Sequence, residues 1–219
     1  MKKYKSIAID GPSGAGKSTI AKILAERINF SYLDTGAMYR MFTYYYLSEN
    51  LDLSDENLVR NHIDKINLKI DKDGFYLNGK KVNKEIRSDQ VTKNVSLISS
   101  YKDIRENLVD QQRAIASQGN IILDGRDIGT VVLKDADVKF FLTASVDERA
   151  RRRYEQLNDP SLSLEAIKKD IERRDAFDSH REISPLRQAE DALLIDSSDY
   201  SIEETVELMI EKLEENNVI

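Results

Sequence analysis

The sequence predicts an α/β fold, in which helices cover both faces of a parallel β-sheet. Three observations carry this prediction. Short apolar runs of strand length alternate with amphipathic stretches of helical period along most of the chain. A glycine-rich loop joins the first apolar run to the first amphipathic stretch. The 219 residues, 40% hydrophobic and 33% charged, suit one globular core with small inserts.

The first predicted strand, Tyr4–Asp10, leads into the glycine-rich loop and a predicted helix over Ile20–Ile28. The loop has the phosphate-binding pattern of Gly, four residues, Gly, Lys, and Ser or Thr. Its residues are Gly11, Pro12, Ser13, Gly14, Ala15, Gly16, Lys17, Ser18 and Thr19. We expect Lys17 to reach the β- and γ-phosphates of a nucleotide and the Ser18 hydroxyl to bind Mg²⁺. A dinucleotide-binding loop fits less well, because no third glycine follows Gly16 at the required spacing.

The second predicted strand, Phe30–Asp34, ends where ligands of open α/β sheets bind. Tyr39 and Arg40 follow it by about one helical turn, and both side chains can bind phosphate. An equally good interpretation makes Thr35 a helix cap and the other two ordinary surface residues. The residues alone leave this choice open.

Residues 67–82 interrupt the alternation of strands and helices. Leu68 and Ile70 alternate with polar residues, and Asp73-Gly74 supplies a turn before a second short strand. We predict a small antiparallel sheet inserted into the α/β core and largely facing solvent. Such an insert can be decoration or a mobile flap over a second substrate, and periodicity does not distinguish the two.

The third predicted strand, Asn120–Asp124, ends in an acid and a tight charged loop. An acid at a strand end near a phosphate-binding loop is the usual holder of Mg²⁺ or its waters, so Asp124 is the candidate. Arg126 and Asp127 project from the loop that follows. A charged pair on such a loop favours ligand binding, although a structural Arg–Asp pair is the alternative.

The fourth predicted strand, Val138–Ala144, leads into an arginine-dense helix and then a loop with Pro and Ser. Ser145 and Glu148 have the spacing of a capping box at the helix start. Four arginines follow: Arg149, Arg151, Arg152 and Arg153. We interpret them as a lid that brings cations onto ATP phosphates. The alternative is a solvated face with pairs such as Glu148 with Arg152.

A further predicted helix places Arg174, Asp178 and Arg181 at spacings i, i+4 and i+7, on one face. Because a guanidinium group binds phosphate oxygens bidentately, this row can hold a ribose and a phosphate. A plain row of salt bridges is the alternative. The fifth predicted strand, Leu193–Ser197, and a last helix capped by Ser201 complete the fold.

Composition excludes several classes of function. The chain has no cysteine, so disulfides, thiolate metal sites and cysteine nucleophiles are absent. The net charge of −6 argues against a nucleic-acid binder. No apolar run reaches the roughly 18 residues of a membrane span, and the run after the N-terminal lysines is too short for a signal peptide. We therefore expect a cytoplasmic enzyme.

The catalytic groups that are missing are also informative. No Asn-Lys-x-Asp element for reading guanine and no histidine-centred acid/base set is present. A phosphoryl acceptor that is itself a phosphate needs no general base, because its oxygen is already ionised. Such an enzyme needs positive charge and geometry, which a phosphate loop and scattered arginines supply.

Four motifs in order, GPSGAGKST, DTGAMYR, DGRDIGTVV and RRDAFDSHRE, resemble the bacterial cytidylate kinase family over essentially the whole chain. The resemblance implies a three-layer α/β/α fold of the P-loop NTPase type, with a five-stranded parallel sheet, an enlarged nucleoside-monophosphate (NMP) domain and a short lid. It implies one domain, with its core at about 1–60, 97–148 and 188–219, the NMP insert at about 61–96 and the lid at about 149–165.

The resemblance also implies an activity: ATP-dependent phosphorylation of CMP and dCMP to CDP and dCDP, with Mg²⁺ as cofactor. The implied protein is a monomer that binds neither nucleic acid nor membrane. Two alternatives stay open. One is a kinase for another small acceptor, and the other is an ATP-binding regulator without catalytic activity.

Residue roles follow from the resemblance, position by position. The loop Gly11–Thr19 would bind ATP phosphates, and Lys17, Arg126 and Arg152 would be catalytic. The CMP phosphate would be surrounded by Thr35, Tyr39, Arg40, Arg126 and Arg181, the ribose by Arg174 and Asp178, and the cytosine by Ser96, Arg105 and Asp127. An Asp accepts from the cytosine amine, whereas uracil presents a carbonyl there. Ser96 and Arg105 rest on the resemblance only, since their helical stretches read as surface.

Overall fold

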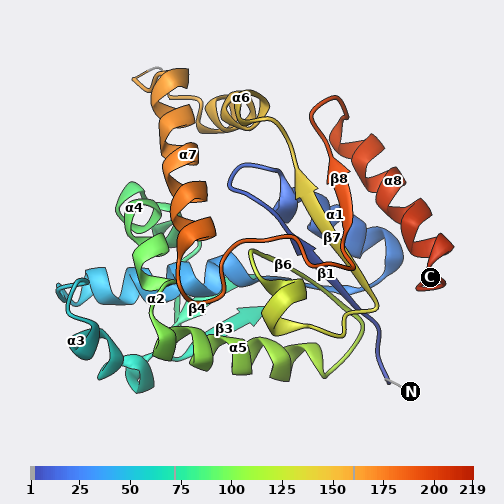
Figure 1. Cartoon of the computed structure of the whole chain (residues 1–219). Helices are drawn as coiled ribbons and strands as arrows, with labels where there is room; N and C mark the ends of the chain where they lie inside the picture. Colours follow the sequence, from blue (N-terminus) through green and yellow to red (C-terminus); the bar gives the residue numbers. More distant parts are fainter. Residues whose placement is uncertain (1–2, 72, 160) are drawn as a thin grey trace. The chain divides into compact units, whose positions relative to one another are not determined.

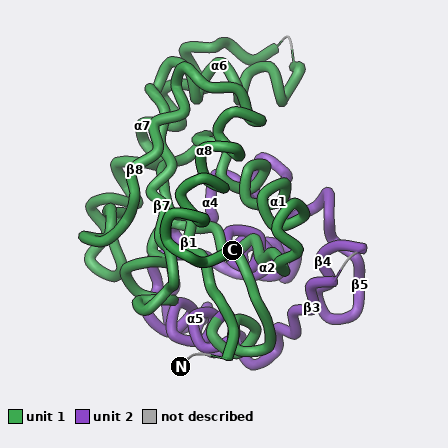
Figure 2. Tube along the Cα trace, turned by 90° about the vertical axis from the view of Figure 1, so that its right-hand side faces the viewer, with its two compact units in different colours: residues 1–34, 113–219 green, residues 35–112 purple. Residues whose placement is uncertain are grey.

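The structure is a computed structural model that describes residues 3–71, 73–159 and 161–219. Pro160 of the predicted lid loop lies outside these residues. The chain divides into two compact units, residues 1–34 with 113–219 and residues 35–112 (Figure 2). Among the residues described, no helix has the length and apolar character needed to cross a membrane.

A five-stranded parallel sheet forms the centre of the first unit (Figure 1). Its strands are β1 (Ser6–Asp10), β2 (Ser31–Asp34), β6 (Ile121–Gly125), β7 (Val138–Thr143) and β8 (Leu193–Asp196). They lie in the order β2-β6-β1-β7-β8, and every pairing is parallel. The bounds of each strand agree with those of a predicted strand to within two residues. The predicted parallel sheet is therefore confirmed.

The helices of the first unit are α1 (Lys17–Ile28), α6 (Val146–Leu157), α7 (Leu164–His180) and α8 (Ile202–Glu215), with a π-helical turn at Ile128–Val132. Helices α1 and α8 pack an apolar face onto the sheet, whereas α6 and α7 pack against each other through Ala150, Ile167 and Ile171. Leu24 of α1 and Met209 of α8 are fully buried in one cluster with Ile7 and Phe140 of the sheet. The predicted capping box at the start of α8 is present, formed by Ser201 with its third helical residue.

The start of α6 differs from its predicted capping box. Ser145 Oγ accepts from the Glu148 backbone N–H at 3.2 Å, as expected. The Glu148 carboxylate, however, accepts from Arg151 and Arg152, while the Ser145 backbone N–H donates to Ser198 Oγ at 2.8 Å. Three charge-assisted bonds from two guanidinium groups outweigh one bond to a backbone amide, so only half of the box forms.

The second unit contains the predicted antiparallel sheet. Strands β3 (Leu68–Asp71), β4 (Gly74–Leu77) and β5 (Lys80–Lys81) lie in the order β3-β4-β5. The helices are α2 (Thr35–Ser48), α3 (Glu56–Arg60), α4 (Asp89–Ile98) and α5 (Lys102–Ala116), with 3₁₀ turns at Ile63–Lys65 and Glu85–Arg87. The last turn of α5 belongs to the first unit. Phe42 and Tyr46 of α2 are buried and meet edge to face.

Candidate active site

The phosphate loop runs from the end of β1 to the start of α1 at Lys17. Two of its glycines are required by the backbone. A Cβ atom at Gly11 would lie 1.9 Å from the carbonyl oxygen of Leu142, and Gly14 has a φ of +78°. The loop therefore turns tightly and ends at a helix N-terminus, which attracts anions through its free N–H groups and its dipole.

Lys17 is buried at the base of this loop. Its Nζ donates to the carbonyl oxygen of Pro12 at 2.7 Å, so the ammonium group points back towards the phosphate loop. Burial and the nearby Arg126 charge lower the pKa of Lys17 to about 7, against the opposing effect of nearby carboxylates, Asp124 first. An anionic ligand on the loop would favour the protonated form of this lysine.

The Asp124 carboxylate, near the end of β6, accepts hydrogen bonds from two hydroxyl groups. Ser18 Oγ and Tyr32 Oη each donate at 2.8 Å. Burial, followed by the negative charge of Asp34, raises the pKa of Asp124 to about 7. The pairing of Ser18 with Asp124 is the one that the sequence predicts for a metal site.

These oxygen donors fit Mg²⁺, which prefers hard ligands and usually takes only one or two from the protein. Within the described ranges, no group of three or more His, Cys, Asp or Glu side chains can hold a metal ion. A bound Mg²⁺ would therefore take the rest of its coordination shell from phosphate oxygens and water.

The turn that follows β6 is held at both ends by charged side chains. The Asp10 carboxylate accepts from the backbone N–H groups of the first two residues of Ile128–Val132, at 2.8 and 2.7 Å. Arg113 donates to the carbonyl oxygens of the last two, at 2.8 and 3.0 Å. Arg126 and Asp127 thus stand on a fixed support. Burial raises the pKa of Asp10 to about 6, although the two N–H bonds oppose this.

Three guanidinium groups and two carboxylates gather beside this turn, and we call them the acceptor face. They are Arg126, Asp127, Arg174, Asp178 and Arg181. Arg126 Nε donates to Asp178 at 3.0 Å, and Arg181 lies 3.8 Å from Asp127. The buried Nε of Arg174 has no hydrogen-bond partner among the described residues. Burial and Arg126 also lower the pKa of Arg174.

The predicted helical row of Arg174, Asp178 and Arg181 is wrong in one respect. Helix α7 ends at His180, and Arg181 has extended dihedral angles, with φ −63° and ψ 144°. Its Nε donates to the Ser184 carbonyl oxygen at 2.6 Å instead of continuing the helix. The residue reaches the face from the chain beyond the helix, not from the helix surface.

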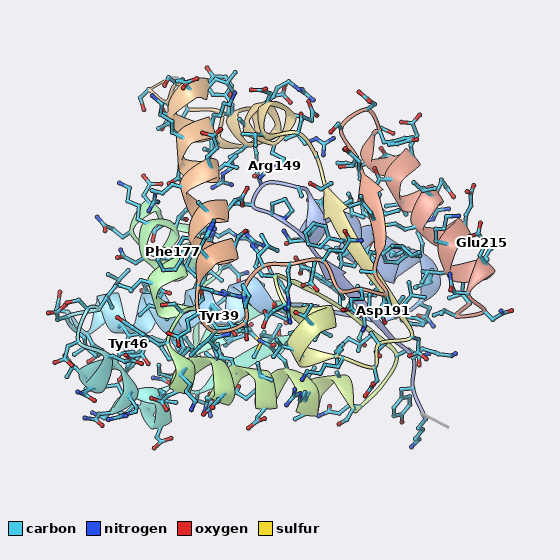
Figure 3. All side chains as sticks on the ribbon, viewed as in Figure 1. Tyr39, Tyr46, Arg149, Phe177, Asp191 and Glu215 are labelled. Atoms are coloured by element: carbon cyan, nitrogen blue, oxygen red, sulfur yellow. The ribbon has the colours of Figure 1, made fainter. Side chains whose placement is uncertain are left out.

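The four arginines of α6 have different surroundings. Arg149, which is labelled in Figure 3, is buried. It donates to the Ser13 carbonyl oxygen in the phosphate loop at 2.7 Å. Arg152 donates to Glu148 and to the Ser197 carbonyl oxygen. Arg151 makes exposed ion pairs with Glu148 and a glutamate one turn later, as the solvated-face interpretation expects.

The sequence reasoning missed Asp175, the partner of Arg149. Asp175 Oδ1 accepts from the Ser13 backbone N–H at 2.8 Å, and its other oxygen accepts from Arg149. A signal was present in the sequence. The buried residues Ile167 and Ile171 mark one face of α7, and Asp175 continues their i+4 spacing.

In the second unit, Tyr39 and Arg105 lie together. The Arg105 guanidinium is 5.3 Å from the centre of the Tyr39 ring, within cation–π range. Arg105 also donates to the Ser99 carbonyl oxygen at 2.8 Å. It is only 3% exposed, although its sequence stretch reads as a helix surface. A charged side chain held this deeply is unusual unless it is paired or serves a ligand.

The other predicted residues of the second unit lie on α2 and α4. Thr35 is buried and is itself the first residue of α2. Arg40 donates to the Ile86 carbonyl oxygen at 3.2 Å and to Thr92 at 2.9 Å, so it is not a plain surface residue. Ser96 is half-buried on α4.

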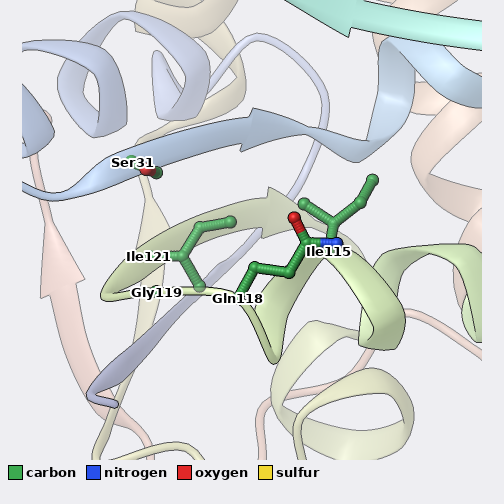
Figure 4. Close-up of a pocket in the computed structure, with 5 residues that line it drawn as sticks. All are labelled: Ser31, Ile115, Gln118, Gly119 and Ile121. Carbon is green, nitrogen blue, oxygen red and sulfur yellow. The ribbon is translucent and has the colours of Figure 1, made fainter.

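A pocket of about 280 Å³ lies elsewhere in the first unit, lined by Ser31, Ile115, Gln118, Gly119 and Ile121 (Figure 4). Ser31 and Ile121 are the first residues of β2 and β6, so the pocket is at the amino ends of these strands. The phosphate loop and Asp124 are at the carboxyl ends. The lining contains no charged side chain, and the pocket plays no part in the site.

Comparison with known proteins gives one consistent result. The family model described as "Cytidylate kinase" matches residues 7–215. Curated proteins named "Cytidylate kinase" are similar over nearly the whole chain. The one from Leuconostoc mesenteroides is 48% identical, covering 97% of both chains. The one from Bacillus subtilis is 45% identical, covering 99% of this chain and all of its own.

Solved structures with similar folds are much more distant in sequence. A shikimate kinase from Acinetobacter baumannii matches with a TM-score of 0.50 at 15% identity, covering 100% of this chain and 97% of its own. An uncharacterized protein from Eubacterium ventriosum matches with a TM-score of 0.56 at 14% identity, covering 97% and 99%. At these identities the likeness shows the fold alone.

Proposed function

We infer the chemistry of this chain from its family, because it belongs to the cytidylate kinases. It is an ATP-dependent kinase that phosphorylates CMP, with CDP and ADP as products. We propose dCMP as a second acceptor. The observation that carries the residue assignments is the contact between Arg126 and Asp178, at 3.0 Å. It joins α7 to the turn that follows Asp124, and so brings the two parts of the acceptor face together.

On the ATP side, we propose that Gly11–Thr19 bind the phosphates through backbone N–H groups and Lys17. Ser18 and Asp124 would hold Mg²⁺, which neutralises charge on the transferring phosphoryl group when it is bound. Lys17 already stands over the loop, so it needs only to exchange the Pro12 carbonyl oxygen for a phosphate oxygen.

On the acceptor side, Arg126 and Arg181 are proposed to bind the CMP phosphate, and Arg174 with Asp178 the ribose. The ionised phosphate oxygen attacks without a general base, so the work of these residues is orientation and charge stabilisation. The Nε of Arg174, which has no partner in the described part of the chain, supports a ligand here, because a buried unsatisfied donor is costly. Asp127 is proposed to accept from the cytosine amine.

The remaining CMP residues are proposed from the family resemblance, and all of them lie in the second unit: Thr35, Tyr39, Arg40, Ser96 and Arg105. The burial of Arg105 supports its inclusion, since sequence pattern alone gives no reason for a charged residue there. We keep Arg152 as the third proposed catalytic residue. It must leave Glu148 and the Ser197 carbonyl oxygen to reach a phosphate.

The test is an acceptor panel. The purified protein is incubated with ATP, Mg²⁺ and each nucleoside monophosphate in turn, and the products are separated. CMP and dCMP should give diphosphates fastest. Rapid turnover of another acceptor would indicate a different small-molecule kinase, and nucleotide binding without any product would indicate a regulator. Sedimentation of the same sample tests the proposed monomer.

A further inference from the structure

One ion pair, Arg149 with Asp175, binds both backbone polar groups of Ser13 in the phosphate loop. The Ser13 N–H donates to Asp175 Oδ1 at 2.8 Å, and the Ser13 carbonyl oxygen accepts from Arg149 Nη1 at 2.7 Å. The second oxygen of Asp175 accepts from the same Arg149 nitrogen. Arg149 Nε donates to the Ala144 carbonyl oxygen at 2.9 Å, which fixes the guanidinium plane.

This pair is not a surface salt bridge. The Arg149 side chain is 6% exposed and that of Asp175 is 18% exposed. Burying two charges costs free energy, so a buried ion pair is not by itself evidence of a stabilising role. Its geometry instead serves the loop. A Cβ atom at Gly14 would lie 3.3 Å from Arg149 Cβ and 3.4 Å from Ile171, so the loop packs directly onto α6 and α7.

The same helix carries part of the acceptor face. Arg174 is the neighbour of Asp175 on α7, and Asp178 lies one turn further along. Asp178 in turn holds Arg126 at 3.0 Å. A single helix, α7, therefore contacts the loop proposed for ATP through Asp175 and carries Arg174 and Asp178 of the face proposed for CMP.

We propose that Asp175 and Arg149 are positioning residues that couple the two substrates. They hold the Ser13 peptide against α6 and α7, so that a nucleotide on the phosphate loop stabilises the α7 orientation that binds the acceptor, and the reverse. The proposal rests on the proposed function, in which ATP and the phosphate and ribose of CMP contact residues of the first unit. The coupling is a free energy shared by two sites, and so it must be the same whichever ligand binds first.

The experiment measures that coupling by calorimetry. The Kd of β,γ-imido-ATP with Mg²⁺ is determined with and without saturating CMP, and the ratio of the two values is the coupling factor. We expect about fivefold or more in the parent protein, the lower end of the usual range. In Asp175→Ala the factor should fall at least threefold towards 1. Asp175→Asn keeps an oxygen for the Ser13 N–H and should be intermediate.

Arg149→Lys is the second variant and keeps the test open if Asp175→Ala does not fold. Its one nitrogen cannot occupy the positions of both Nε and Nη1 of Arg149, so contacts with Ala144, Ser13 or Asp175 are lost and the factor should fall here as well. The matched control is Lys168→Ala, which removes another pair between α7 and α6, Lys168 with Asp147 at 2.6 Å. That pair is at the surface and touches no part of the loop, so the parent coupling factor should be kept.

Two results would overturn this inference without contradicting the proposed function. One is a coupling factor of 1 in the parent protein, and the other is an unchanged coupling factor in folded Asp175→Ala and Arg149→Lys. Unchanged factors are expected if the two residues have a purely structural role, because the substitutions would then lower the melting temperature and leave the ratio of the two Kd values unchanged. A parent that binds the ATP analogue but not CMP contradicts the proposed function itself.

Discussion

The hydroxyl group of Tyr32 donates to the Asp124 carboxylate at 2.8 Å. This bond fixes one carboxylate oxygen, and the other accepts from Ser18. The proposed Mg²⁺ ligands are therefore oriented before any metal arrives. Partners of this kind commonly matter for metal affinity although they do not touch the metal.

Tyr32→Phe removes only the hydroxyl group and leaves the ring in place. We expect the Mg²⁺ concentration for half-maximal activity to rise about tenfold, the low end of the effect of losing such a partner. A thermal-shift titration with Mg²⁺ and ATP provides a second readout without turnover. Unchanged Mg²⁺ dependence in both measurements would show that Tyr32 does not orient the site.

Lys17→Ala should reduce kcat by about 10²–10³-fold, the usual loss when one charge-stabilising donor is removed. The fold should persist, because burial already disfavours the charged form of this lysine, and its Nζ donates its hydrogen bond to the Pro12 carbonyl oxygen and not to a carboxylate. Circular dichroism and single-turnover transfer on the same sample check both points. Near-normal turnover would refute the role given to Lys17.

Asp127→Ala should weaken the preference for CMP over UMP, because the acceptor for the cytosine amine is lost. Asp127→Asn is the sharper variant, since its amide can donate to the uracil carbonyl and should raise activity with UMP. The measurement is kcat/KM for both monophosphates. If the CMP to UMP ratio stays at the parent value in both variants, cytosine is read elsewhere.

Asp10 predicts a specific pH dependence of stability. Its pKa is raised by burial from 3.8 to about 6, so the folded state binds the proton more tightly than the unfolded state. The contribution of this group is complete below pH 3.8 and is lost as the pH rises through about 6. The loss is about 3 kcal/mol in the free energy of unfolding, at 1.36 kcal/mol per pKa unit.

Asp10→Asn removes this titration. Urea unfolding of the parent and the variant between pH 4 and 7 should give a stability difference that shifts towards the variant as the pH rises. A difference that stays constant across that range would mean that Asp10 does not titrate there.

The local parts of the fold and site could be predicted from sequence. The phosphate loop is a run of nine residues whose glycines and lysine act on one another directly, and its expected strand and helix are present. The strands were recognisable as short apolar runs, and Asp73-Gly74 marked the turn before β4. In each case the physical cause lies within a few residues.

The rest depends on contacts between distant parts of the chain. Asp10 binds amide groups 118 and 119 residues away, and Asp175 binds a loop 162 residues away, so no local pattern identifies the partner of either residue. Arg149 and Arg152 look alike in sequence, yet only tertiary packing turns Arg149 towards the loop. Arg181 lies beyond the end of the helix, and its guanidinium group bonds to the Ser184 carbonyl oxygen.

The most direct measurement is a crystal structure of the protein with β,γ-imido-ATP, Mg²⁺ and CMP bound together. The account predicts triphosphate oxygens on the backbone of Gly11–Thr19, the CMP phosphate on Arg126 and Arg181, and the cytosine amine on Asp127. A pyrimidine monophosphate bound away from these three residues, with the nucleotide triphosphate on the loop, would contradict it.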